Sequence, residues 1–137
     1  MASREALSVR PASDLAASLA LLERAERYEV TGAARVADLI AGCAVFDVVA
    51  DGQTVGAFAV RVDTYSTGRE LSVTAAGGVG DLGQTEAMAA WCEQQARDVI
   101  GARALSCQTR RRGLVRKLEG LGYRVSGYIM TKIEGEG

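Results

Sequence analysis

Four glycines gather in one short segment of the chain, at Gly77, Gly78, Gly80 and Gly83, followed by Gln84. The residues after this segment have helical periodicity. Backbone N–H groups in the first turn of a helix lack partners within the helix and attract anions. Glycine lets the main chain approach a ligand closely enough to use these donors. The spacing is typical of a phosphate-binding loop, and equally of a simple flexible connection between a strand and a helix.

Acid–base chemistry in this chain must use groups other than histidine, because the sequence contains none. This excludes Ser-His-Asp and Cys-His catalysis and the common histidine metal sites. Glu70, at the start of an expected strand, is the candidate general base. Asp47 and Asp63 on neighbouring strands carry the same two interpretations, a catalytic carboxylate or a solvated strand end.

A run of three arginines, Arg110, Arg111 and Arg112, precedes the last expected helix. The positive end of the helix dipole disfavours cations there by about 0.3–1 kcal/mol each. Three solvated arginines on an exposed turn are the commonest explanation. The functional alternatives are a binding surface for an acidic partner, and contacts with the phosphates of a cofactor.

The composition of the chain argues against several classes of function. The chain has 137 residues, 48% hydrophobic and 24% charged, with a net charge of −1, and we expect a single domain over residues 1–137. The small negative charge argues against nucleic-acid binding. The three widely spaced cysteines favour buried packing residues over a disulfide framework or a metal site. No apolar run approaches the length of a membrane span, so we expect a soluble, cytoplasmic protein.

The periodicity predicts an α/β (α+β) domain in the order β-α-α-β-β-β-α-β-α-β. Its sheet should be mixed and mainly antiparallel, with helices on both faces. An Asp51-Gly52 turn predicts a hairpin between the second and third strands. The expected strands are 5–10, 43–50, 54–63, 70–75, 102–108 and 123–133, and the expected helices are 14–28, 34–41, 86–100 and 110–121.

This order, with its glycine loop, resembles the GCN5-related N-acetyltransferase (GNAT) superfamily over residues 5–133. The segment from Leu7 to Ala12 is similar to the opening strand of that family, and the segment from Leu71 to Thr74 to its fourth strand. The segment from Leu118 to Tyr123, Leu-Glu-Gly-Leu-Gly-Tyr, is similar to its C-terminal signature. The resemblance implies a site for acetyl-CoA formed by Val73, Gly77, Gly78, Gly80, Gly83 and Gln84.

Two positions depart from the family pattern. The loop from residue 76 to residue 84 contains no Arg or Lys, and Asp81 places a negative charge where the resemblance implies a pyrophosphate. Leu118 stands where many family members have a tyrosine that protonates the departing thiolate, and leucine cannot donate a proton.

These departures favour a GNAT-fold protein with a degraded acetyl-CoA site, a pseudoenzyme that acts in binding or self-assembly. The segment around residues 110–124 also resembles GNAT-like proteins of tailed bacteriophages, which implies a virion component and a protein partner or oligomer. The alternative is a working acetyl-CoA-dependent N-acetyltransferase that acts on an amine of a small molecule or a protein. No membrane partner is expected under either hypothesis.

Overall fold

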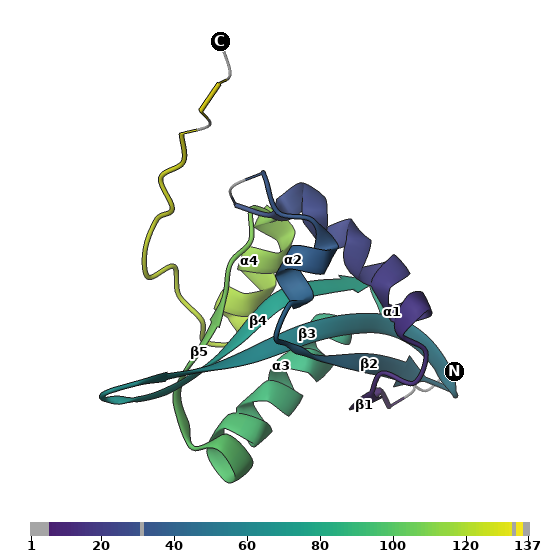
Figure 1. The fold of residues 1–137 in the computed structure, drawn as a ribbon. Helices are drawn as coiled ribbons and strands as arrows, with labels where there is room; N and C mark the ends of the chain where they lie inside the picture. The colour runs from purple at the N-terminus through teal and green to yellow at the C-terminus, as the bar shows by residue number, and fades with distance from the viewer. Residues whose placement is uncertain (1–5, 31, 133, 136–137) are drawn as a thin grey trace.

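A computed structural model of the chain describes residues 6–30, 32–132 and 134–135 (Figure 1). The strands form one five-stranded sheet in the order β1-β2-β3-β4-β5. Neighbouring strands are antiparallel, except that β4 and β5 are parallel. The strands are β1 (Ser8–Pro11), β2 (Ala44–Ala50), β3 (Gln53–Tyr65), β4 (Gly68–Gly78) and β5 (Ala102–Cys107).

Helices cover both faces of this sheet (Figure 1). One face carries α1 (Leu15–Leu22), the 3-10 helix η1 (Glu23–Tyr28) and α2 (Val36–Ile40). The other face carries α3 (Gln84–Gln95), which continues as the π-helical turn η2 (Ala96–Ile100), and α4 (Arg112–Gly120) lies beside α3. None of the described helices is long and apolar enough to cross a membrane.

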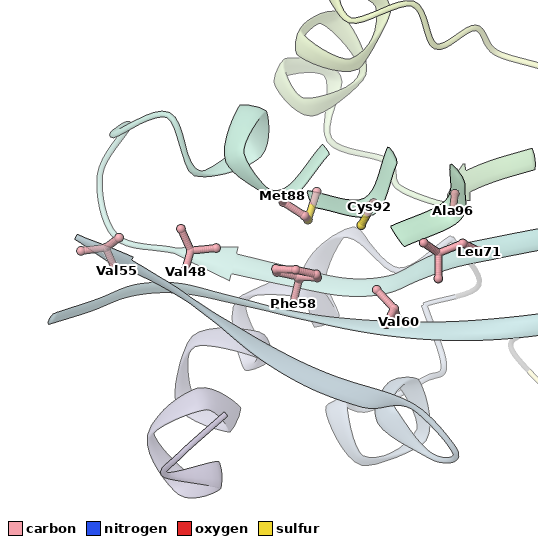
Figure 2. Packing of buried hydrophobic residues seen from close by; sticks show 8 residues of the cluster. All are labelled: Val48, Val55, Phe58, Val60, Leu71, Met88, Cys92 and Ala96. Atoms are coloured by element: carbon pink, nitrogen blue, oxygen red, sulfur yellow. The ribbon is translucent and has the colours of Figure 1, made fainter. Parts of the chain in front are cut away.

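Each face of the sheet has its own core. On the α3 face, the side chains of Phe58 and Leu71 lie opposite Met88 and Cys92 from the helix (Figure 2). Both sheet residues are almost completely buried, at 0% and 1% exposure. Side chains alternate between the two faces of a strand, so the residues next to Phe58 face the other way. The second core, on the α1 face, is formed by Leu22, Ala57, Ala59 and Ala75.

The predicted fold class is confirmed, and so is the hairpin, whose turn residues Asp51 and Gly52 have positive φ angles of 50° and 75°. The first helix is shorter than expected, since its second half is the 3-10 helix η1. The expected strand 5–10 is also shifted and includes Pro11, whereas Glu5 lies outside the described residues. Proline is tolerated there because β1 is an edge strand.

The expected final strand at residues 123–133 is wrong for the described part of that segment. Residues 123–132 form neither helix nor strand, and residue 133 lies outside the described residues. The alternating pattern is present, but a strand forms only when its backbone groups find a neighbouring strand. The segment runs away from the body of the domain (Figure 1).

Candidate functional site

The two parallel strands at the end of the sheet separate part-way along their length. β4 pairs with β5 from Arg69 to Val73, where Val73 lies opposite Cys107, the last residue of β5. β4 then continues to Gly78, and over this stretch β3 is its one partner among the described residues. Within the described chain, the edge of β4 from residue 74 to residue 78 therefore has no strand neighbour on its β5 side.

A cleft of about 490 Å³ opens at this separation. The open part of β4, the end of β5, η1 and the start of α4 form its walls. A second hollow of about 230 Å³ reaches the first turn of α3. The two share lining residues and so form one continuous site; the shared residues are Ala76, Gly77, Gly78, Gly80, Arg111 and Leu114.

The loop between β4 and α3 leads into the helix through glycine in the left-handed region. Gly80 has a φ of 67°, and Gly83, the N-cap of α3, has a φ of 86°. Gly83 provides no side-chain cap, so the first turn of α3 presents N–H groups toward this end of the site. The Gln84 amide holds the loop in shape: it donates to the carbonyls of Val55 (3.2 Å) and Val79 (2.8 Å) and accepts from the Leu82 N–H (2.8 Å).

Gly77 is required by packing. A Cβ at this position would overlap the backbone carbonyl of Leu21, because α1 crosses β4 at close range. Gly78 is also confined, since its Cβ would lie 3.1 Å from the Val55 carbonyl oxygen. Four of the predicted cofactor residues, Val73, Gly77, Gly78 and Gly80, line the cleft. Their contact with a cofactor stays a prediction.

Basic side chains reach the site from elements distant in sequence from the loop. Arg24 of η1 lines the cleft and donates to the carbonyl of Gly78. Arg111 lines both parts of the site, and Lys117 lines the part next to α3. Lys117 Nζ lies 2.7 Å from a carboxylate oxygen of Asp81. The Asp81 charge, expected to oppose a phosphate, is therefore compensated by a lysine of α4.

The three consecutive arginines have different surroundings. Arg110 donates from its guanidinium to the carbonyl of Arg27 and from its backbone to that of Tyr28, which joins the start of α4 to η1. The Arg111 guanidinium lies over the Tyr28 ring, 5.8 Å from its centroid. Arg112 is exposed at the first position of α4. A role for the three in partner binding stays a prediction.

The three carboxylates considered as bases lie away from the cleft. Glu70 accepts a hydrogen bond of 3.0 Å from the Tyr65 hydroxyl and lies in the part of β4 that is paired with β5. Asp47 is buried and accepts one of 2.6 Å from Ser18. The residues that line the site do not include Glu70, Asp47 or Asp63. Whether Glu70 acts as a base stays a prediction.

Glu29 is the carboxylate that sequence patterns missed. It lies at the end of η1 and is the one carboxylate among the described residues that line the larger cleft. One of its oxygens accepts from the Ala34 N–H at 3.4 Å. No signal in the sequence pointed to it, because it precedes an irregular segment and is far from the glycine loop in sequence.

Cys107 and Leu118 lie close to the site, and neither provides a base at neutral pH. Burial raises the pKa of the Cys107 thiol to about 11, so this side chain in the cleft wall stays protonated at neutral pH. Leu118 is buried and lines a separate groove beside β5. Leu114, rather than Leu118, is the leucine of α4 that lines the cleft.

No protein-family model matches this chain, and no curated protein matches it in sequence.

Solved structures share the architecture at low sequence identity. A transcriptional regulator from Bacillus halodurans has a TM-score of 0.71 at 16% identity, over 93% of this chain and 99% of that one. A ribosomal-protein-alanine N-acetyltransferase from Brucella melitensis has a TM-score of 0.70 at 14% identity, over 96% of this chain and 100% of that one. An aminoglycoside N-acetyltransferase solved with CoA has a TM-score of 0.67 at 15% identity, over 96% of each chain. This chain therefore has the fold of the GNAT acetyltransferases.

Proposed function

We propose that this protein is an acetyl-CoA-dependent N-acetyltransferase that acts on an amine of a small molecule or a protein. The observation that carries the proposal is the cleft between β4 and β5, which continues to the first turn of α3. Among proteins with the same fold are N-acetyltransferases, and one of them was solved with CoA. A cleft of about 490 Å³ is of the size that small-molecule sites have.

The phosphates of acetyl-CoA would bind at the α3 end of the site. There the helix N-terminus offers backbone N–H groups and the positive end of its dipole. Arg111 adds positive charge from the start of α4, while Lys117 neutralises Asp81. The charge that the loop lacks in its own sequence is thus available from another element.

The extended arm of acetyl-CoA carries amide groups that can pair with an open strand edge. β4 offers such an edge from residue 74 to residue 78, where β3 is its one partner in the described chain. Pairing an extended ligand with a free strand edge satisfies alternating N–H and C=O groups. This would place the thioester near Val73 and Cys107, where the two strands separate.

The chemistry would be direct transfer. The amine nitrogen forms a bond to the thioester carbonyl carbon, the C–S bond breaks, and the sulfur takes a proton to become the CoA thiol. An N–H group on the open edge of β4 would polarise the carbonyl oxygen. Glu29 is our candidate for the group that removes the proton from the amine, because it lines the cleft and carries a carboxylate.

The first test is a calorimetric titration of the purified protein with acetyl-CoA. We expect saturable binding at micromolar levels, and weaker binding for Arg111→Ala and Arg24→Ala. Arg97→Ala is the matched control, because Arg97 is an exposed arginine on η2 that does not line the site. Absence of binding at millimolar acetyl-CoA would overturn the proposal.

The second test is turnover of acetyl-CoA with a panel of amines, followed through the released thiol. Glu29→Gln should lower the rate about 100-fold and leave acetyl-CoA affinity nearly unchanged. Glu70→Gln should leave both unchanged, because Glu70 lies outside the cleft. A large loss of turnover in Glu70→Gln, with nearly normal turnover in Glu29→Gln, would instead identify Glu70 as the base.

A second candidate function is binding or assembly without catalysis. It is supported by Leu118, which cannot protonate a thiolate and which does not line the cleft. This hypothesis predicts binding of acetyl-CoA without turnover of any amine, or no binding at all. Charge reversal of Arg110, Arg111 and Arg112 would test for an acidic partner, since it should weaken assembly.

The narrower suggestion of a phage virion component has no support in the similar structures described above, none of which is a phage protein. It stays a prediction. Genes for portal, capsid or tail proteins beside this one would favour it, and a metabolic neighbourhood would count against it.

A further inference from the structure

The 3-10 helix η1 sorts its charged side chains into rows. Its sequence, Glu-Arg-Ala-Glu-Arg-Tyr over residues 23–28, repeats in character every three residues. A 3-10 helix has three residues per turn, so side chains three positions apart lie one above the other. An α-helix, with 3.6 residues per turn, would not keep such rows aligned. The rows are acidic, basic and uncharged, formed by Glu23 and Glu26, by Arg24 and Arg27, and by Ala25 and Tyr28.

The acidic row lies outside the cleft, whereas the basic row lines it. Glu26 accepts a hydrogen bond of 2.7 Å from the Val36 N–H and lies 3.9 Å from the Arg35 guanidinium, both at the start of α2. Neither glutamate of the row lines the site, and both arginines, Arg24 and Arg27, line the larger cleft. The three-residue repeat of η1 therefore brings positive charge to the cleft in a chain whose net charge is −1.

The two arginines of the basic row have different neighbours. Arg24 donates to the carbonyl of Gly78, which lines both the cleft and the hollow next to α3. Arg27 lies one turn further along η1, a rise of about 6 Å. Within the described chain no carboxylate pairs with the Arg27 guanidinium. Arg24 is thus engaged with the end of β4, and the charge of Arg27 is available to a ligand.

The turn that carries Arg27 is fixed by the start of α4. The Arg110 guanidinium donates to the Arg27 carbonyl, and the Arg110 N–H donates to the Tyr28 carbonyl at 3.0 Å. The Glu29 N–H donates to the Glu26 carbonyl at 3.2 Å and ends the helix. A side chain on a backbone held in this way needs less ordering when it binds a ligand.

Glu29 brings the opposite charge to the same wall of the cleft. It follows Arg27 by two residues, so their Cα atoms are at most about 7 Å apart. Both side chains line the larger cleft and neither lines the hollow next to α3. A guanidinium binds a carboxylate or a phosphate through paired hydrogen bonds, and a carboxylate attracts an ammonium group. The pair is complementary to a small molecule that carries an amine and an acidic group close together.

We propose that the acceptor is a small zwitterion, an amine that carries a carboxylate or a phosphate on the same molecule; this inference rests on the proposed acetyl transfer. Arg27 holds the acidic group, which takes no part in the reaction, and the amine lies at Glu29. The ammonium loses one proton to solvent and a second through Glu29 as the N–C bond forms. The C–S bond breaks, and the sulfur takes up one proton. An amine without an acidic group leaves Arg27 unpaired in the complex.

The test is turnover of acetyl-CoA by the full chain with matched pairs of acceptors. The pairs are free amino acids against their C-terminal amides, and phosphoethanolamine against ethanolamine. We expect kcat/KM to be about 10- to 100-fold higher for the acidic member, the effect of one hydrogen-bonded charge. Which pairs show the preference distinguishes a carboxylate from a phosphate. An amino-acid amide has the less basic amine, so amine reactivity alone would favour the amide. Equal values within every pair overturn the proposal.

Substitution of Arg27 identifies the group that selects the acid. Arg27→Ala should raise the KM for the acidic acceptor about 10- to 100-fold and leave the KM for acetyl-CoA unchanged. Arg27→Lys should keep part of the preference, because lysine keeps the charge but not the paired hydrogen bonds. Arg97→Ala, at an exposed arginine outside the site, is the matched control and should keep all of it. A raised KM for acetyl-CoA alone in Arg27→Ala would assign Arg27 to the cofactor and overturn the proposal.

Calorimetric titration of the same acceptors into the protein saturated with CoA separates this inference from the proposed function. Binding of the acid but not of the amide, without turnover of any amine, would overturn acetyl transfer and support the subsite at Arg27. Turnover of amines with no preference for the acidic member would support acetyl transfer and overturn the zwitterionic acceptor. Binding of neither member of any pair would also overturn it.

Discussion

The two halves of strand β4 have opposite surroundings. From Arg69 to Val73 the strand has neighbours on both sides, and Leu71 is almost completely buried under α3. Beyond Val73 it keeps only β3, and its free edge lines the cleft. The first half stabilises the sheet, whereas the second half gives up pairing on one side and lines a cleft. One continuous strand can therefore hold a site rigidly while exposing backbone groups to it.

The two halves of β4 should differ most in how much a substitution lowers the free energy of unfolding. Leu71→Ala should lower the free energy of unfolding by about 2–5 kcal/mol, because it leaves a cavity in the core. Thr74→Ala in the open half should cost about 1 kcal/mol, since it removes the long hydrogen bonds of the Thr74 hydroxyl to the Ala59 carbonyl and to the Cys43 thiol. Urea unfolding measures both. Equal losses would show that the open half is as tightly built as the paired half.

The point where the strands separate can be probed through Cys107. Its pKa is raised to about 11 by burial, so alkylation at pH 8 should be about 100-fold slower than for a free thiol. In the unfolded chain the Cys107 thiol begins to lose its proton at about pH 9, whereas in the folded chain it keeps this proton until about pH 11. Stability should therefore fall as the pH rises from about 9 to about 11. Mass spectrometry of alkylated peptides reports the rate, and Cys107→Ala identifies the residue. Fast alkylation at pH 8 would show an open, solvated junction.

Within the open half, Gly77 should respond to packing. Gly77→Ala should cost about 1–3 kcal/mol, because the added Cβ meets the Leu21 carbonyl. Gly120→Ala is the matched control: it lies in α4 with no neighbour in the way, and should be neutral or stabilise by up to about 1 kcal/mol. Thermal unfolding distinguishes the two. A neutral Gly77→Ala would mean that α1 can move away from β4, and that this glycine serves a ligand.

The smallest effect concerns the end of the cleft and rests on the proposed function. Asp81→Asn should strengthen acetyl-CoA binding by about two- to fivefold, because it removes a negative charge and releases Lys117 from an exposed ion pair. The gain should shrink at high salt. Asp98→Asn, at an exposed aspartate on η2 outside the site, should leave the affinity unchanged. Weaker binding in Asp81→Asn would mean that the ion pair holds Lys117 in its binding position.

Local patterns were sufficient for most of the fold. Alternation along residues 54–63 predicted β3, and helical spacing after the glycine loop predicted α3. The Asp51-Gly52 turn predicted the hairpin that joins β2 to β3. The same kind of pattern failed at residues 123–132, where alternation was present but pairing was not. Neighbours in sequence also do not reveal the partner of Asp81, because Lys117, which pairs with it, lies on α4.

By itself, the sequence determined the order of the elements as far as α4, the glycine turns and the absence of histidine chemistry, because these depend on residue type and near neighbours. Tertiary structure alone decided where β4 leaves β5, and that Arg24 and Glu29 line the resulting cleft while Lys117 lines the adjoining hollow. The physical reason is that side chains from η1 and α4 converge only after the helices have packed on the sheet. Their distance in space has no signature in their distance along the chain.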